Sequence, residues 1–516
     1  MLHKKCAALL AAATALAMLA GCGAVEPRVD PSSSSSVASS SASSSSSSAT
    51  GDRADRRLRF PCNLSDSFNP YTCETATNLH LMSLLYQPLV RLGADYSVEN
   101  VLAADVRLDG LVCTVTIDPS ARFTNGDALT AADVAASCRA AMESPHYADA
   151  LTNIENVETD GDDTLRLTLR EADAFFVNLL TFPIVRAGTQ ADALPLGTGR
   201  YLLRDLESGA PVLAANNVYY ADAQPAYRNI ELVDNPDTRE QVYDLRLGNL
   251  DLVAEDVTDK EVLNIGTAAY YDTNALVYLG FQCGGGVTRD VAFRTALAGA
   301  LDSASVLAEA YGGSGTATHT LLNPNAFPDL TSSIARDAAP LTAYLSAAGY
   351  EITDAEGYRV NAEGQRLSLK LLVNSDNPAR YAAAQALVQQ CKAVGVEVVL
   401  TAEPFGTYVT MLQNGAYDLY LAEVRLPLNF DLTALLSPAS GTAFGFAEDE
   451  ELLYTHALFR TGEATAQQLV DQFETQLPFL PLFYHASSVI YTRALLHVAP
   501  LQQDLFYNLE EWRFAE

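Results

Sequence analysis

A serine tract near the N-terminus limits where a fold can begin. Of the 17 residues from Ser32 to Ser48, fourteen are serine. Side chains this small and polar cannot bury enough apolar surface to offset the entropy lost on ordering. We therefore predict a flexible tether over residues 22–57 and a folded body that begins near Leu58. About 460 residues remain in this body, which exceeds one hydrophobic core and predicts two lobes or more.

The first 21 residues have the pattern of an export signal. Lys4 and Lys5 precede an apolar run, 7–20, that is too short to span a bilayer comfortably. The stretch Leu19-Ala20-Gly21-Cys22 resembles the lipobox of bacterial lipoproteins. That resemblance implies cleavage before Cys22, a diacylglyceryl group on this cysteine, and anchoring at the extracytoplasmic face of the cell membrane. An ordinary cleaved signal or an N-terminal membrane anchor is the alternative.

The charge and hydropathy of the chain exclude some classes of binding partner. The formal net charge of −31 argues against nucleic acid and against attraction to anionic lipid. Hydrophobic residues make up 49% of the chain, and the mean hydropathy is +0.06, as expected of a well-folded body. No further run of 18 apolar residues follows the leader, so we expect no second membrane segment.

Cysteine and histidine spacing gives no support for a metal or another cofactor. Six cysteines follow the leader, none in a CxxC pair: Cys62, Cys73, Cys113, Cys138, Cys283 and Cys391. They are either small buried residues or partly disulfide-bonded, with Cys62 and Cys73 as one pairing. The seven histidines are scattered without HExxH or HxH spacing. We therefore expect no metal site.

Strand and helix patterns alternate along the body, which predicts an α/β architecture with a largely parallel sheet in the second half. We expect strands at 112–117, 164–169, 230–233, 367–373, 396–400, 418–424, 480–484 and 489–491, and a second region that starts near 275–281. We expect helices at 78–86, 240–247, 290–300, 303–311, 379–394 and 408–413. Thr130 with Asp133 predicts a capping box at the start of one more helix, and Asp302 predicts the cap of another.

Seven stretches carry a resemblance that covers nearly the whole body. The run Phe123–Val134 is similar to a "F-x-D/N-G-x-x-(L/V)-T-A-x-D-V/F" pattern, and 197–201 is similar to "G-T-G-P-Y". The other stretches are 68–70 with 86–90, 248–251, 294–297, 300–302 and 347–350. Taken in their order along the chain, these stretches resemble the peptide/nickel-type (family 5) extracellular solute-binding proteins of ABC importers, in the oligopeptide- and dipeptide-binding group.

The resemblance implies an α/β, two-lobed periplasmic-binding-protein-like fold with two crossovers and a ligand cleft between the lobes. The large lobe would be 58–265, completed by 483–516, and the small lobe 272–480. The lobes would close around solute like a hinge. We expect a monomer that captures a peptide or similar small solute and delivers it to an ABC transporter permease, without acting as an enzyme.

The resemblance also implies where the cleft lies. One edge would be Glu74, Thr75 and Ala76, and the other would be the strand exit Glu423-Val424-Arg425. Extended peptides bind there through main-chain hydrogen bonds, like an added strand. This binding mode favours affinity without strict side-chain specificity.

The sequence departs from the resemblance at the group that holds a ligand's α-ammonium. Oligopeptide binders carry Trp-x-x-Asp-Tyr near this exit, whereas here Val424 is at the tryptophan position and Pro427 at the acid position. Asp431, Glu74 or Glu423 are the candidate replacements. The remaining alternative is a ligand without a free amine.

Arginine and tyrosine side chains complete the candidate site. Arg425 is a candidate to bind a carboxylate of the ligand through two parallel hydrogen bonds. The alternative is a salt bridge from Arg425 to Glu423 or Glu403. Arg380 at a helix start is a second carboxylate candidate. Tyrosines are candidates to wall side-chain pockets or to pack in the core: Tyr71, Tyr86, Tyr278 and Tyr408.

Two other functions stay open at this point. A surface signalling receptor or adhesin on the same fold is compatible with the lipid anchor. An exported hydrolase has less support, because the chain has no Gly-x-Ser-x-Gly elbow, no helix-initial SxxK and no HExxH. A nickel or haem ligand occurs within the resembled family, but the cleft segments hold no histidine, so we favour a short peptide or a related anionic organic solute.

Overall fold

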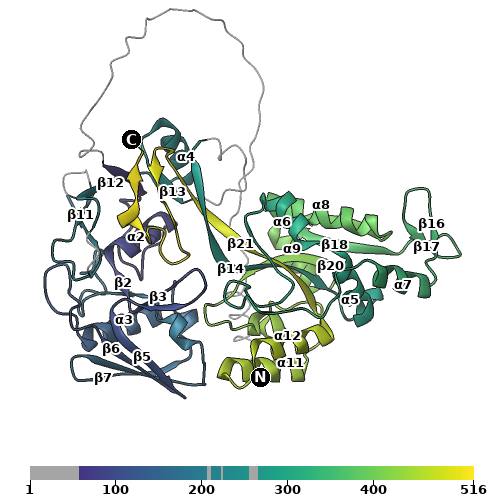
Figure 1. Cartoon of the computed structure of the whole chain (residues 1–516), viewed down its shortest axis with the longest axis horizontal. Helices are drawn as coiled ribbons and strands as arrows, with labels where there is room; N and C mark the ends of the chain where they lie inside the picture. Colours follow the sequence, from purple (N-terminus) through teal and green to yellow (C-terminus); the bar gives the residue numbers. More distant parts are fainter. Residues whose placement is uncertain (1–56, 206–210, 222–224, 255–264, 516) are drawn as a thin grey trace, which may run out of the picture.

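The computed structural model describes residues 57–205, 211–221, 225–254 and 265–515. The predicted export signal, the lipid attachment at Cys22 and nearly all of the tether lie outside the described residues. The described chain forms two lobes, one on each side of Figure 1, joined by the long strands β14 (Thr267–Phe281) and β21 (Phe479–Tyr491).

The lobe on the left of Figure 1 contains two four-stranded sheets. The first has the order β1-β12-β11-β10, with strands Leu58–Cys62, Asn229–Asp234, Val212–Ala215 and Tyr201–Arg204. Its β1 and β12 are parallel, and the other pairs are antiparallel. The second is antiparallel with the order β5-β6-β8-β7, with strands Ala103–Asp109, Val112–Ile117, Thr164–Leu169 and Ile154–Asp160. The helices are α2 (Ala76–Leu85), α3 (Ala131–Glu143) and α4 (Thr238–Leu247).

One seven-stranded sheet organises the other lobe and extends into the first. Its order is β13-β21-β14-β20-β18-β19, with β15 also paired to β21. The strands are Leu252–Ala254, Phe479–Tyr491, Thr267–Phe281, Leu419–Arg425, Ser368–Asn374, Glu397–Glu403 and, for β15, Gly315–Ala317. Only β18 forms parallel pairs, with β19 and β20. The predicted largely parallel sheet is therefore wrong, because the long strands add antiparallel partners from distant parts of the chain.

Helices cover both sides of this sheet in Figure 1, with α8 on one side and α11 and α12 on the other. The helices are α5 (Val291–Ala300), α6 (Ser303–Tyr311), α7 (Ala339–Ala347), α8 (Pro378–Ala393), α9 (Phe405–Gln413), α10 (Thr433–Leu436), α11 (Glu450–Thr461) and α12 (Ala466–Gln476). Short strand pairs complete the fold: β2 (Gln87–Pro88) with β9 (Pro183–Ile184), β3 (Val90–Leu92) with β4 (Val98–Asn100), β16 (Ile352–Thr353) with β17 (Arg359–Val360), and β22 (Leu495–Leu496) with β23 (Arg513–Phe514).

Local capping signals in the sequence are confirmed. Thr130 and Asp133 form the capping box of α3, with the Thr130 hydroxyl 2.6 Å from the Asp133 carboxylate. The Asp302 carboxylate accepts hydrogen bonds from two backbone N–H groups in the first turn of α6. Both signals depend on residues within three positions of each other, which explains why sequence alone locates them.

The two long strands carry the chain between the lobes. Residues 267–272 of β14 pair with 486–491 of β21, and residues 275–280 pair with 479–485. An irregularity in register between Asp272 and Ala275 marks the passage from one lobe to the other. The sequence predicted two strands, 480–484 and 489–491, where the structure has one. The polar residues between them, His485 to Ser488, lie within the strand where it crosses between the lobes.

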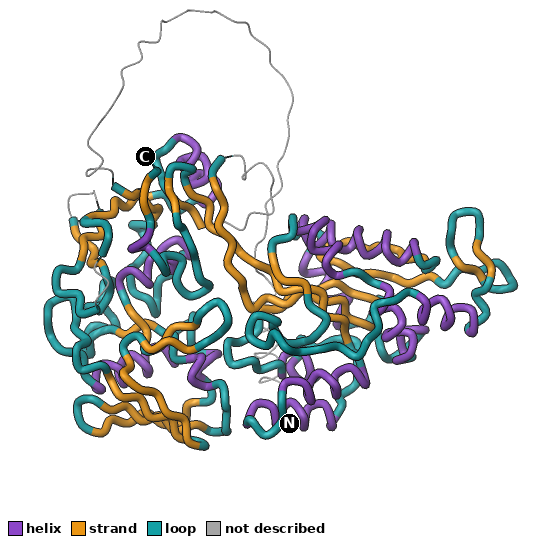
Figure 2. Tube along the Cα trace, viewed as in Figure 1, coloured by secondary structure: helices purple, strands orange, loops and turns teal. Residues whose placement is uncertain are grey.

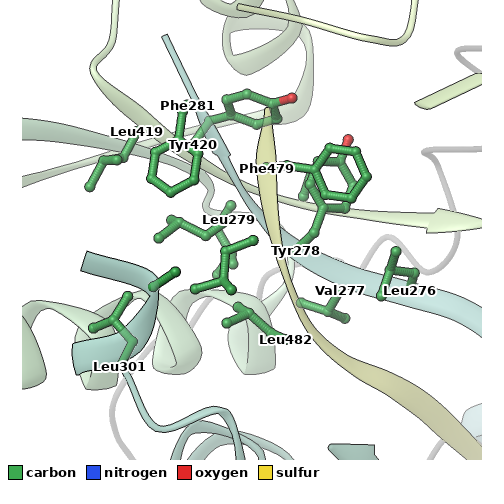
Figure 3. Packing of buried hydrophobic residues seen from close by; sticks show 14 of the residues in the cluster. Leu276, Val277, Tyr278, Leu279, Phe281, Leu301, Leu419, Tyr420, Phe479 and Leu482 are labelled. Carbon is green, nitrogen blue, oxygen red and sulfur yellow. The ribbon is translucent and has the colours of Figure 1, made fainter. Parts of the chain in front are cut away.

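Each lobe has its own hydrophobic core. One cluster gathers buried residues from Leu58 to Leu252 and from Val489 to Trp512, and the other gathers residues from Leu276 to Tyr484. Figure 3 shows part of the second cluster, in which Tyr278 of β14 packs against Phe479 of β21. Phe483 and Tyr484 pack in this second cluster, so the return to the first lobe comes slightly later than the predicted residue 483.

Two glycines allow the backbone of residues 197–199 to pack directly against the C-terminal end of helix α2. A Cβ at Gly197 would lie 2.2 Å from the Leu85 carbonyl oxygen, and one at Gly199 would lie 2.3 Å from the Leu84 carbonyl oxygen. The Gly199 N–H donates to the Leu85 carbonyl at 3.0 Å. Only glycine permits this approach, so the Gly-Thr-Gly motif fixes the end of α2 and, with it, the helix face described below.

The six cysteines in the described part of the chain are free thiols, and Cys283 is the one among them that is not buried. Burial raises the pKa of the Cys391 thiol to about 12. Within the same residues, no single helix has the length and apolarity of a membrane span; α5 and α6, bent by 58°, meet that criterion only as a pair.

Candidate functional site

A cavity of about 2410 Å³ lies between the two lobes. One face of α2 lines it from the large lobe, including Ala76, His80 and Ser83. The small lobe contributes the segment that follows β20 and the helix α11. The crossing strands provide residues at the back, among them Tyr271 and Ser487. The two lobes and the passage between them therefore build one site.

The cavity wall is nearly balanced in charge although the chain is strongly acidic. Its charged side chains other than histidine are six arginines and seven carboxylates: Arg91, Arg170, Arg200, Arg239, Arg425, Arg460, Asp118, Asp149, Glu171, Asp431, Asp504, Glu510 and Glu511. The formal net charge of the whole chain is −31. The excess acid thus lies elsewhere, and the wall suits a ligand with polar and charged groups of both signs.

The end of β20 presents main-chain groups beside this wall. The Leu426 N–H donates to the Asn274 carbonyl at 2.8 Å, on the β14 side. Hydrogen bonding alternates along an antiparallel strand, so the main-chain groups of Glu423 and Arg425 face the opposite side, toward β18. Pairing with β18 ends where Val373 lies opposite Leu421. The strand edge at Glu423 and Arg425 therefore continues past its last β18 partner.

Arg425 lies at this edge and lines the cavity with an exposed side chain. Within the described residues its guanidinium makes no hydrogen bond and no ion pair. Of the two predicted alternatives, the ion pair with Glu423 or Glu403 is absent from this structure. The arrangement leaves the guanidinium available to an anionic group in the cavity.

Glu423 instead pairs with Arg380. The Arg380 Nη2 is 3.1 Å from the Glu423 Oε2, and His485 Nδ1 is 3.9 Å from the other carboxylate oxygen. Burial by itself raises the pKa of Glu423, but the nearby His485 and Arg380 outweigh it and hold the pKa at about 2. Neither Glu423 nor Arg380 lines the cavity, although Pro378 and Ala379 do. The pair supports the wall from behind.

Asp431 lines the cavity and is bound by its own lobe. Its carboxylate lies 2.6 Å from the Arg460 Nη1 and accepts the Thr433 hydroxyl at 2.6 Å. Burial raises its pKa, but the Arg460 charge and the Thr433 hydrogen bonds prevail and lower it. Its neighbour His456 accepts the Leu432 N–H on Nε2, and burial lowers the pKa of this histidine to about 4. His456 is therefore neutral at neutral pH.

Arg460 also joins the two lobes. Its Nη2 lies 2.6 Å from the carboxylate of Asp173, a large-lobe residue whose side chain is fully buried. The same carboxylate accepts the Asn429 amide at 2.7 Å. Next to it, Phe175 packs edge-on against Phe430, with ring centroids 5.2 Å apart. A polar and aromatic contact thus connects the lobes in addition to the two strands.

The predicted large-lobe edge is differently arranged. The N–H groups of Glu74 and Thr75 and the Thr75 hydroxyl all bind the Asp66 carboxylate, at 2.6 to 3.1 Å. They are therefore not open to a peptide. Of the three predicted residues only Ala76, the first residue of α2, lines the cavity.

Two further predicted residues lie in the core. Tyr278 is 2% exposed and packs on Phe479 with ring centroids 5.0 Å apart, and burial raises its pKa to about 12. Val424 is buried in the same cluster. The structure therefore places Ala76, Arg425 and Asp431 at the cavity, and it places Glu74, Thr75, Glu423, Val424, Arg380 and Tyr278 away from its lining.

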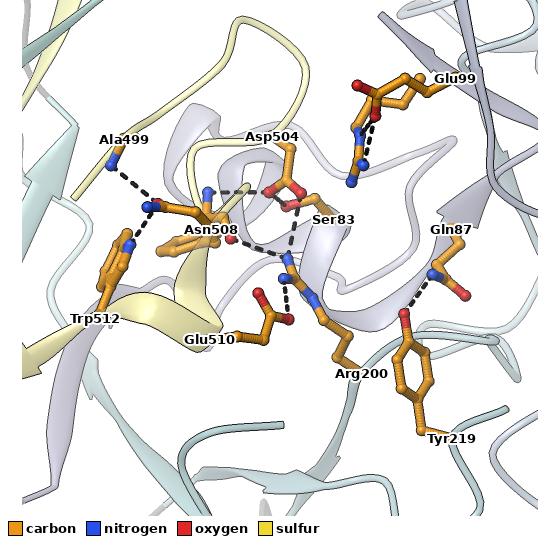
Figure 4. Close-up of polar contacts among 12 residues, drawn as sticks. Ser83, Gln87, Glu99, Arg200, Tyr219, Ala499, Asp504, Asn508, Glu510 and Trp512 are labelled. Carbon is orange, nitrogen blue, oxygen red and sulfur yellow. Dashed lines mark hydrogen bonds and ion pairs between the residues drawn. The ribbon is translucent and has the colours of Figure 1, made fainter. Parts of the chain in front are cut away.

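Sequence analysis did not find the charged cluster around Arg200 at the large-lobe wall (Figure 4). Arg200 pairs with Glu510 at 2.8 Å and with Asp504 at 3.2 Å, and Asp504 also accepts the Ser83 hydroxyl at 2.7 Å. The cluster fixes the C-terminal segment against α2. Its signal in the sequence was Arg200 itself, which stands where the resembled "G-T-G-P-Y" pattern has proline.

No group of three or more histidine, cysteine, aspartate or glutamate side chains in the described ranges is arranged to hold a metal ion. The cavity wall does contain histidines, namely His80, His146, His456 and His485, so the expectation that the cleft segments hold none is wrong.

Two α/β lobes, joined by two strands, enclose a polar cavity in this chain. This is the construction of a periplasmic-type binding protein. Comparison with known proteins identifies the family. The family model for bacterial extracellular solute-binding proteins, family 5 Middle, matches residues 97–443, and the chain belongs to this family. The family and the two-lobed fold predicted from the seven motifs are thus confirmed.

Individual relatives are distant but cover most of the chain. The nickel-binding periplasmic protein of Escherichia coli is 22% identical over 84% of this chain and 89% of its own length. The structure of NikA from Brucella suis in complex with Fe(III)-EDTA matches with a TM-score of 0.69 and 18% identity, over 89% of this chain and 100% of that chain. AppA from Bacillus subtilis in complex with a nonapeptide matches with a TM-score of 0.57 and 20% identity, over 89% and 99%.

The chain is therefore a family 5 solute-binding protein, a class that supplies ABC transporters from outside the cytoplasm. Its homologues are substrate-binding proteins and not enzymes.

Proposed function

We propose that this protein is a lipid-anchored receptor that captures a peptide or a related small organic solute between its lobes and delivers it to the permease of an ABC importer. The observation that carries the proposal is the open edge of β20 beside the cavity. Main-chain groups at a strand edge bind the backbone of an extended ligand. Such binding suits a family in which one relative is crystallised with a nonapeptide.

The size of the cavity supports a ligand longer than a single metabolite. Pockets for drug-sized molecules usually occupy about 300–1,000 Å³. The cavity here measures about 2410 Å³. Its balanced wall of arginines and carboxylates suits an amphoteric chain such as a peptide.

Capture without turnover is tested directly by the solute that the protein carries. We expect the full chain, purified from membranes without added ligand, to release a small peptide-like solute on denaturation, detected by mass spectrometry. Incubation of the refolded protein with that solute should leave its mass unchanged. Conversion of the solute into products would contradict the binding function and favour the hydrolase.

Lipid anchoring depends on Cys22. We expect the Cys22→Ala variant to leave the membrane fraction, because the diacylglyceryl group provides the two acyl chains that stable anchoring requires. Cell fractionation with antibody detection measures this release, and Cys6→Ala serves as the matched control, since Cys6 lies inside the predicted signal. Membrane association that persists in the Cys22→Ala variant would exclude the lipid anchor.

A further inference from the structure

The carboxylates of the cavity wall are mostly engaged by protein groups. Asp431 is held by Arg460 at 2.6 Å. Asp504 and Glu510 share Arg200, at 3.2 and 2.8 Å. A ligand ammonium would have to displace a guanidinium from any of these carboxylates.

The other carboxylates of the wall offer little more to a cation. Asp118 accepts the N–H and the hydroxyl of Ser120, at 2.8 and 2.6 Å. Asp149, Glu171 and Glu511 are exposed and belong to the large lobe. None of these three belongs to β20 or to the segment after it, so none supplies a negative charge from this strand edge.

Arg425, the candidate to bind an anionic group of the ligand, is not engaged by a carboxylate in the described part of the protein. Arg425 lines the cavity, its side chain is exposed, and it has no ion-pair partner among the described residues. The nearest carboxylate in the sequence, Glu423, is two residues away and is bound by Arg380. Arg425 is therefore a guanidinium whose paired donors are not used within the protein.

Pro427 supports the same conclusion. It lines the cavity two residues beyond Arg425 and contributes neither charge nor an N–H donor. The end of β20 and the segment that follows it thus present to the cavity one positive charge without an ion-pair partner in the described structure, Arg425, and no unpaired carboxylate.

From this imbalance we infer that the site selects its solute by a carboxylate placed against Arg425 and does not require a free α-ammonium. The ligand class is an extended carboxylic acid whose amine is blocked or absent, such as an N-acylated peptide acid. The inference deepens the proposed function and rests on it, because the solute occupies the same cavity and the same strand edge.

Four forms of each peptide test this inference. A small library of tri- to pentapeptides is prepared with free ends, with an acetylated N-terminus, with an amidated C-terminus and with both changes. Dissociation constants are measured by calorimetry on the full chain and on Arg425→Gln. The control variant is Arg107→Gln, whose exposed arginine pairs with Asp105 and is not part of the cavity wall.

We expect acetylation to change the dissociation constant by less than about threefold and amidation to raise it by about tenfold or more, as for a lost charge-assisted hydrogen bond. In Arg425→Gln the effect of amidation should disappear, while Arg107→Gln should behave as the unmodified chain. A tenfold loss on acetylation, or no loss on amidation, would overturn the inference and leave the proposed function intact. If no peptide binds in any form, the proposed peptide-like solute is wrong and the inference falls with it.

Discussion

Replacing Glu423 with glutamine is expected to lower the free energy of unfolding by about 3–5 kcal/mol at neutral pH, because it leaves a buried charge without its partner. Arg380, whose side chain is 5% exposed, loses the carboxylate 3.1 Å away. Its Nε already lacks a hydrogen-bond partner within the described structure. Glutamine has nearly the same volume as glutamate, so the loss reports on charge and not on packing. Denaturant unfolding followed by circular dichroism measures it.

Glu403→Gln is the matched control. Glu403 ends the neighbouring part of the same sheet, in β19, and is partly exposed. No ion pair of its side chain is found within the described residues. We expect this substitution to change stability by less than about 0.5 kcal/mol, as for surface changes away from special features. Equal losses in the two variants would show that the buried pair contributes nothing specific.

The same pair predicts how stability depends on pH. The folded pKa of Glu423, about 2, lies below its ordinary value of 4.5. The unfolded chain therefore binds the proton more readily, and the stabilisation is complete above pH 4.5 and is lost as the pH falls toward 2. A shift of this size corresponds to about 3 kcal/mol. We expect the stability gap between the unmodified chain and Glu423→Gln to narrow across this window. A gap that does not change with pH would contradict the assignment.

Sequence analysis located the elements whose signals are local. The strands 112–117 and 164–169 match the alternating patterns, and the Thr130–Asp133 box and the Asp302 cap fix the first turns of their helices. These features depend on neighbours a few residues apart, so tertiary contacts do not override them. Strand direction failed because it depends on partners that are distant in sequence: β14 pairs with β20 and β21.

The candidate site shows the same limit. Arg380 and Arg425 were both carboxylate candidates in the sequence, and what separates them is Glu423, which binds the former and not the latter. The Arg200 cluster joins residues about three hundred positions apart. Motif order can identify the family and the general region of the cleft. It cannot assign ion-pair partners, because these depend on how the lobes bring distant segments together.

Asp173→Asn is expected to cost about 3 kcal/mol, at the low end for breaking a buried ion pair, because Arg460 keeps Asp431 as a second partner. The Asp173 carboxylate is fully buried and accepts hydrogen bonds from Arg460 and Asn429 of the other lobe. Both groups donate to Oδ2, whereas Oδ1 accepts the Phe175 N–H at 3.0 Å. An asparagine that keeps its oxygen for Arg460 and Asn429 would therefore turn its NH₂ toward this N–H and leave it unsatisfied. Since the partners come from both lobes, amide hydrogen exchange should rise in 174–178 and 428–432, on the two sides of the contact.

The exposed pair of Asp160 and Arg166 supplies the comparison that separates this interlobe effect from general charge loss. Their side chains are 74% and 47% exposed and their charged atoms are 3.5 Å apart, so Asp160→Asn should cost no more than about 1 kcal/mol and should leave exchange at the lobe contact unchanged. If Asp173→Asn lowers stability while exchange in 174–178 and 428–432 stays at the level of the control, the carboxylate stabilises the large lobe alone. If exchange rises in both segments together, the Asp173–Arg460 contact helps to hold the two lobes at the separation seen in this structure.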